Sequence, residues 1–121
     1  MKSKIITMQP WGWDGNLVIG GDPSIFSPKM IRELGLHEYD GALKGLGGWT
    51  WLPLGGSWVI WLETITNIPV LAHEGFHMVS GVLETRGLIH TKESEEAYAY
   101  TLQSFLEQAL SKKGWTKVDD F

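Results

Sequence analysis

The sequence predicts an α+β fold in which a small antiparallel or mixed sheet packs on two helices. Short β-prone runs occupy much of the first half of the chain, and glycine and proline residues separate them. Two segments with the helical spacing of apolar residues follow in the second half. A chain of 121 residues can bury one core, so we expect a single domain over residues 1–121.

Several short segments are predicted to form the sheet and its turns. Residues 5–8 and 17–19 form a hairpin or a pair of edge strands, because Pro10, Gly12 and Gly15 interrupt the chain between them. The remaining segments are a strand or loop at 49–52, a turn at 53–56, a strand at 57–63 and a surface tail or short strand at 115–121.

Capping residues mark three predicted helices. Ser27 precedes a short helix at 28–34, which has proline at its first position and glycine beyond its end. The second helix, at about 67–84, begins with asparagine and proline and is closed by Gly87. The third, at about 94–113, carries two glutamates in its first turn, where acidic side chains complement the helix dipole.

Composition narrows the functional classes. Lys and Arg number 10 against 14 Asp and Glu, and no basic stripe is present, so we expect no nucleic-acid partner. The chain has no cysteine, so any metal must be held by histidine and carboxylate side chains. No apolar run approaches the roughly 20 residues of a membrane span or forms a signal-peptide core. We therefore expect a cytoplasmic protein with no membrane association.

The segment VLAHEGFHMVSGVLE at 70–84 contains the strongest functional pattern. His73 and His77 are four residues apart, so a helix places both imidazoles on one face, where they can bind the same ion. The pattern His-Glu-x-x-His supplies two zinc ligands and, in Glu74, a base that acts on the metal-bound water. The competing interpretation is that one histidine is a satisfied core residue and the other makes a local hydrogen bond.

A catalytic zinc site takes three protein ligands, so a third is expected downstream. A following helix that folds back antiparallel can bring its first turn to the metal. We favour Glu96, because it lies on the inward side of this helix if Ala99 and Leu102 face the core. His90 is the second choice, and the acidic residues of the first turn also serve to complement the helix dipole. The full set of candidates is His90, Glu93, Glu95 and Glu96.

HEGFH followed after eighteen residues by EAYA resembles the gluzincin class of zinc metallopeptidases. The order of strand WVIWLE and the two helices is also similar to small metallopeptidases encoded by bacteriophages and prophages. The resemblance covers about residues 57–110 and implies a minimal zincin-like core, a bound Zn²⁺ ion, a peptide or protein substrate and a phage or host protein as partner. A phage-encoded protein would act in the host cytoplasm.

The resemblance also implies roles for individual residues. His73, His77 and Glu96 would be the zinc ligands, and Glu74 would be the general base. An edge strand beside the active-site helix would hold an extended peptide, a role that falls to Trp58, Val59, Ile60 and Trp61. The motif does not place the residue that stabilises the transition state, which leaves His90, Tyr100, Tyr98, Tyr39 and His37 as candidates.

A second hypothesis starts from the seven tryptophans. The chain could be a catalytically inactive phage structural or assembly protein whose fold is stabilised by metal and whose Trp-rich surface binds a partner. The metal site would then be closed by a fourth protein ligand such as His90, with no water left to activate. We favour tryptophans that fill the core over tryptophans that form a binding surface.

Overall fold

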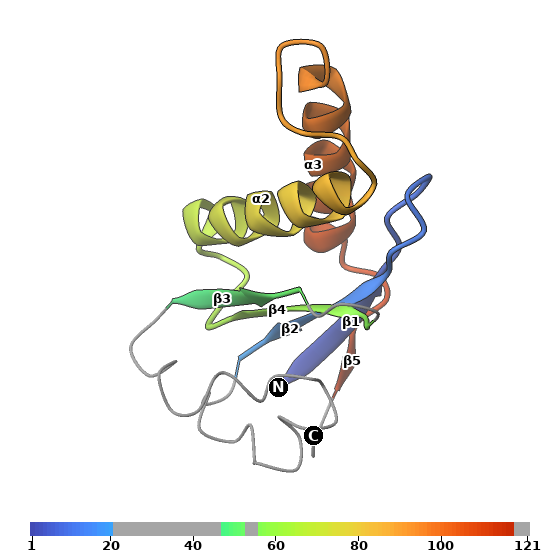
Figure 1. Cartoon of the computed structure of the whole chain (residues 1–121). Helices are drawn as coiled ribbons and strands as arrows, with labels where there is room; N and C mark the ends of the chain where they lie inside the picture. The colour runs from blue at the N-terminus through green and yellow to red at the C-terminus, as the bar shows by residue number, and fades with distance from the viewer. Residues whose placement is uncertain (21–46, 53–55, 118–121) are drawn as a thin grey trace.

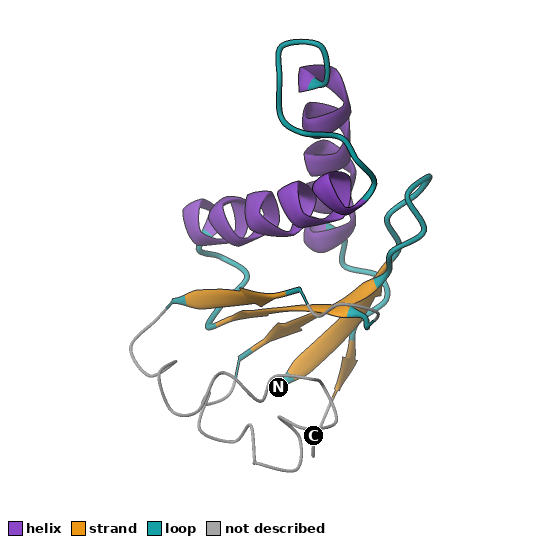
Figure 2. Cartoon of the chain, viewed as in Figure 1, coloured by secondary structure: helices purple, strands orange, loops and turns teal. Residues whose placement is uncertain are grey.

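The computed structural model describes residues 1–20, 47–52 and 56–117, in which a five-stranded mixed sheet carries two helices on one face (Figures 1 and 2). The α+β class is therefore confirmed. The predicted helix at 28–34 and most of the predicted turn at 53–56 lie outside the described residues, as do His37 and Tyr39. The elements are β1 (Lys2–Ile6), β2 (Gly15–Ile19), β3 (Gly48–Trp51), β4 (Trp58–Leu62), α2 (Ile68–Thr85), α3 (Glu95–Leu110) and β5 (Thr116–Lys117).

The strands lie in the order β3-β4-β2-β1-β5. β1 and β2 pair antiparallel as a hairpin, one of the two predicted arrangements, although β1 begins and ends earlier than the predicted strand at 5–8. β2 and β4 run parallel, and β3 is antiparallel to β4. The prediction that Trp58, Val59, Ile60 and Trp61 form an edge strand is wrong, because β4 pairs with a strand on each side. All five residues of β4 are buried, which is typical of a central strand covered on both faces.

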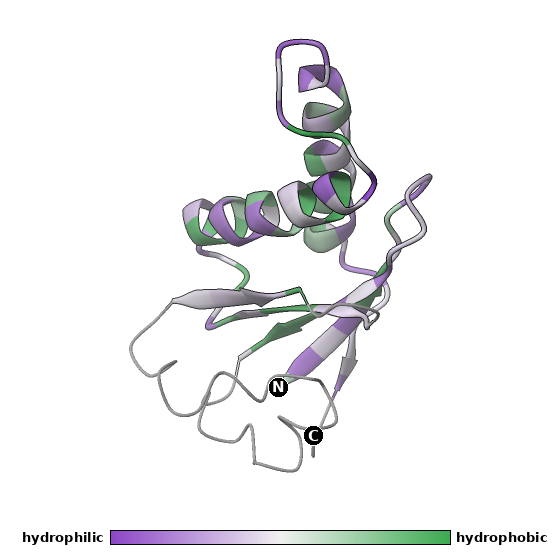
Figure 3. Cartoon of the chain, in the orientation of Figure 1, coloured by the Kyte–Doolittle hydropathy of each residue, from purple (hydrophilic) through white to green (hydrophobic). Residues whose placement is uncertain are grey.

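Apolar side chains between the sheet and the helices form the core. β4 consists of apolar residues alone and β2 carries three apolar residues in a row, whereas β1 includes charged positions (Figure 3). Trp58 packs edge-to-face on Phe105 of α3, with ring centroids 6.1 Å apart. The core comprises Ile6, Met8, Leu17, Trp58, Ile60, Leu62, Leu71, Met78, Val79, Val82, Leu83, Tyr98, Phe105 and Ala109.

The three most buried tryptophans are interior residues. Trp49, Trp58 and Trp61 are at most 4% exposed, which confirms for these three that tryptophan fills the core. The indole of Trp58 donates to the carbonyl of Trp13 at 2.9 Å, and that of Trp61 donates to the carbonyl of Gly20 at 3.0 Å. The other four tryptophans are partly buried, so none of the seven is fully exposed.

Helix α2 has a well-defined cap at each end. The side chain of Asn67 accepts a hydrogen bond from the Val70 amide at 3.3 Å. At the other end Gly87 has φ +82°, and the amide of Leu88 donates to the carbonyl of Leu83 at 2.8 Å. This pattern is a Schellman motif, in which glycine takes the left-handed conformation that ends the helix. No helix in the described residues is long and apolar enough to cross a membrane.

Helix α3 begins after Ser94 as predicted but ends at Leu110, three residues early. Lys4, on β1, donates from Nζ to the carbonyls of Gln108 and Ser111, both at 2.6 Å. Its ammonium also lies 4.7 Å from the centroid of the Trp115 ring. Burial lowers the pKa of Lys4, while the carbonyls and the negative end of the helix dipole favour its charged form. A lysine from the sheet thus caps α3.

The inward face of α3 differs from the predicted one. Tyr98, Thr101, Phe105 and Ala109 are buried, at the spacing of a helix face. Ala99 is exposed, so the premise that it faces the core is wrong, whereas Leu102 is partly buried and packs against the core. Glu96 is exposed as well.

Replacing Lys4 by Met should lower the free energy of unfolding by about 2 kcal/mol, because two charge-assisted hydrogen bonds to α3 are lost while the apolar stem is kept. Urea unfolding followed by circular dichroism measures the change. Lys2→Met is the matched control, since Lys2 is exposed on the same strand. Equal effects of the two substitutions would contradict a specific cap.

Candidate metal centre

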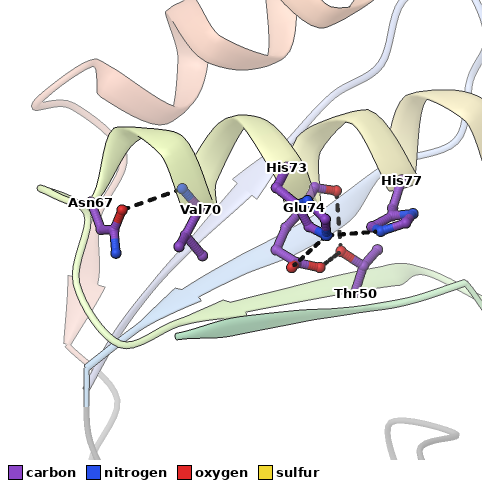
Figure 4. A network of polar contacts seen from close by, with 6 residues as sticks. All are labelled: Thr50, Asn67, Val70, His73, Glu74 and His77. Atoms are coloured by element: carbon purple, nitrogen blue, oxygen red, sulfur yellow. Dashed lines mark hydrogen bonds and ion pairs between the residues drawn. The ribbon is translucent and has the colours of Figure 1, made fainter. Parts of the chain in front are cut away.

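The two histidines of α2 point toward the same place. Their Nε2 atoms lie 3.2 Å apart, with ring centroids at 4.8 Å and ring planes at 79°. Both side chains are exposed, and Figure 4 shows them on the side of α2 that faces Thr50 of β3. The i to i+4 spacing therefore brings the two imidazoles together, as predicted.

Two ring nitrogens at this separation need either a hydrogen atom or a metal ion between them, because two facing lone pairs or two facing N–H groups repel each other. A proton carried by one ring satisfies the geometry as a hydrogen bond. A metal ion satisfies it equally well, since two nitrogens at Zn–N distances of about 2.0–2.1 Å span a tetrahedral edge of about 3.3 Å. The separation of the two nitrogens thus matches one edge of a tetrahedral zinc coordination sphere.

Glu74 lies beside this pair and is nearly buried, with 7% of its surface exposed. Its Oε1 accepts a hydrogen bond from the Thr50 hydroxyl at 2.8 Å, and its Oε2 lies 3.9 Å from Nε2 of His73 (Figure 4). One carboxylate oxygen is therefore anchored on β3, and the other is directed toward the imidazoles. A carboxylate held in this way could accept a proton from a group bound beside His73.

Among the described residues, no group of three or more His, Asp or Glu side chains is close enough to hold one metal ion. α3 crosses α2 at Gly75, where Phe105 and Leu102 approach most closely. Gly75 lies about 200° around the helix from His73, so α3 packs on the side of α2 away from the imidazoles. Glu96 is nine residues before Phe105, about 13 Å along α3. The prediction of Glu96 as third ligand gains no support from this arrangement.

His90 lies in a different cluster. Its ring centroid is 4.6 Å from that of Tyr98 and 6.2 Å from that of Phe76. The hydroxyl of Tyr98 donates to the carbonyl of Leu88 at 2.7 Å, and burial together with the Glu84 carboxylate raises its pKa. The structure therefore places His90 and Tyr98 in an aromatic contact that holds the loop between the helices.

The other candidate residues are also apart from the pair. Tyr100 is 66% exposed on α3, and Glu93 and Glu95 are exposed near the start of that helix. β4 lies beneath α2 as a central strand, so its backbone cannot pair with a substrate peptide. The roles predicted for His90, Tyr100 and these glutamates remain predictions.

Thr50 was not identified from the sequence. The signal lies in the alternation of GWTW at 48–51, which places the threonine on the opposite face of the strand from its two tryptophan neighbours. Its pairing with Ile60, a residue of the core under the helices, shows which face that is. Reading this signal requires knowing that β3 lies under α2.

Comparison with protein-family models, with curated proteins and with solved structures finds no match.

Gly75, at the centre of HEGFH, allows the two helices to meet. A Cβ atom there would lie 2.5 Å from Cε1 of Phe105, whose ring is fully buried. We expect Gly75→Ala to destabilise the chain by about 1–3 kcal/mol through overpacking, despite a gain of about 1 kcal/mol in helix propensity. Urea unfolding measures the net effect.

Phe105→Leu provides the control for this clash. It should cost less stability in the Gly75→Ala background than in the wild type, because the smaller side chain makes room for the methyl group. A Gly75→Ala chain that is more stable than the wild type would contradict the close crossing.

Proposed function

We propose that this chain is a zinc-dependent peptidase in which His73 and His77 are metal ligands and Glu74 is the general base. The proposal is carried by the convergence of two imidazoles and one anchored carboxylate on the same side of α2. The 3.2 Å between the Nε2 atoms supports it, because this separation matches an edge of a tetrahedral zinc site. Imidazole ligands without thiolates also suit a catalytic zinc site.

Each residue has a distinct task in this proposal. Bound zinc would supply a Lewis acid and lower the pKa of its water. His73 and His77 hold the ion through Nε2. Glu74 accepts a proton from the attacking water at Oε2 and delivers it to the nitrogen of the leaving amine. The remaining coordination positions are not assigned to a residue.

The alternative, an inactive structural protein with a Trp-rich binding surface, has weaker support. Three of the seven tryptophans are interior and the other four are partly buried. His90, its fourth ligand, packs on Tyr98 and Phe76 instead of joining the histidine pair. The arrangement of the described residues therefore favours neither a Trp-rich binding surface nor His90 as a fourth ligand.

Zinc content tests the metal site. The wild-type chain, purified without chelator and reconstituted, should contain about one zinc ion per chain by elemental mass spectrometry. His73→Ala and His77→Ala should each remove most of it, since a single imidazole remains. Both side chains are exposed, so neither substitution should unfold the chain, and circular dichroism checks this.

Two further variants test whether His90 or Glu96 is a zinc ligand. His90→Ala and Glu96→Ala should keep zinc at the wild-type level, because neither side chain is brought to the pair. Loss of zinc in Glu96→Ala would show that Glu96 is a ligand together with His73 and His77, as the gluzincin resemblance implies. A wild-type chain that binds no zinc after reconstitution would refute the proposal.

Glu74→Gln tests the base. The variant should keep zinc, because Glu74 is not assigned as a ligand, and should hydrolyse fluorescein-labelled casein about 10²–10⁴ times more slowly. Glu84→Gln, an exposed position on the same helix, is the control and should leave the rate unchanged. A zinc-loaded wild type that does not cleave casein would contradict a peptidase while leaving the metal site in place.

A further inference from the structure

The contact between Thr50 and Glu74 joins the sheet to the proposed base. The threonine hydroxyl lies 2.8 Å from Oε1 of Glu74 and 3.1 Å from the backbone carbonyl oxygen of the same residue. A hydroxyl has one hydrogen to donate, and a carboxylate is the stronger acceptor of the two. The hydrogen bond to the carboxylate is therefore the dominant one.

The position of Thr50 on β3 makes its hydroxyl a fixed donor. Threonine is branched at Cβ, so its side chain has few rotamers on a strand. The strand is held by antiparallel pairing with β4, where Thr50 is opposite Ile60. A donor fixed in this way restricts the rotation of the Glu74 carboxylate, whose side chain has only a small exposed surface.

We propose that Thr50 is a positioning residue for the base of this site. By holding Oε1, it keeps Oε2 directed at the histidine pair, where a proton must be accepted. This inference rests on the proposed peptidase function. A hydroxyl that only ties α2 to β3 would affect stability, whereas a hydroxyl that orients the base also affects the rate of the chemical step.

Thr50→Val removes the hydroxyl and keeps the branched shape, and Thr50→Ser keeps the hydroxyl. With zinc-loaded protein and labelled casein, we expect Thr50→Val to lower kcat by about tenfold to a hundredfold, the value of one hydrogen bond to a charged group. KM and zinc content should stay at their wild-type values. Thr50→Ser should retain most of the rate, and Thr50→Val should cause no further loss in a Glu74→Gln background.

A double-mutant cycle on the metal-free chain tests the contact independently of hydrolysis. Thr50→Val and Glu74→Met should be non-additive in their effects on urea unfolding, because each removes one partner of the same hydrogen bond. Additive effects would overturn the inference, whatever the hydrolysis assay shows.

The remaining outcomes separate this inference from the proposed function. An active wild type together with an unchanged kcat in Thr50→Val would overturn the inference alone and leave the peptidase in place. An inactive zinc-loaded wild type would refute the proposed function, and the positioning role would fall with it, even if the cycle showed the contact.

Discussion

The buried carboxylate of Glu74 is the constraint on which the rest of the site depends. A carboxylate removed from water must find a hydrogen-bond partner, and Thr50 of β3 provides one at 2.8 Å. This contact requires Glu74 to face the sheet, and together with the buried apolar residues of α2 it sets the rotation of the helix about its axis. The positions of His73 and His77 follow from that rotation. They lie about 100° and 60° of helix rotation from Glu74 in the same direction, and therefore both emerge next to the carboxylate on the side of α2 that faces Thr50 (Figure 4).

The second constraint is the crossing of α2 and α3 at Gly75. A glycine lets Phe105 approach the helix backbone, and Lys4 then fixes the far end of α3 to β1. α3 is thereby kept on one side of α2, and the first turns of α3 extend past the crossing (Figure 1). The histidine pair is not covered by α3, which is compatible with a substrate reaching it. The same geometry separates Glu96 from the pair.

Local signals predicted much of this fold, and the misses concern tertiary packing. The ends of α2 could be located because Asn67 and Gly87 act on neighbouring backbone groups. The central position of β4 could not, because SWVIWLE is equally compatible with an edge strand until its two partners are known. The inward face of α3 was misassigned by one residue. Tyr98 and Ala99 both fit an apolar stripe, and only the packing of the folded chain determines which of them faces the core. The convergence of His73 and His77 was predictable from spacing, whereas Thr50 lies on a distant strand and was missed.

X-ray diffraction from crystals of the zinc-loaded chain, with data collected on both sides of the zinc absorption edge, tests the central claim most directly. We expect an anomalous peak about 2.0–2.1 Å from Nε2 of both His73 and His77, with Oε1 of Glu74 still bonded to Thr50 and Oε2 outside the coordination sphere. An anomalous peak elsewhere would contradict binding of zinc by the two histidines. A structure in which Glu74 has moved from Thr50 to bind the metal would contradict its role as an anchored base.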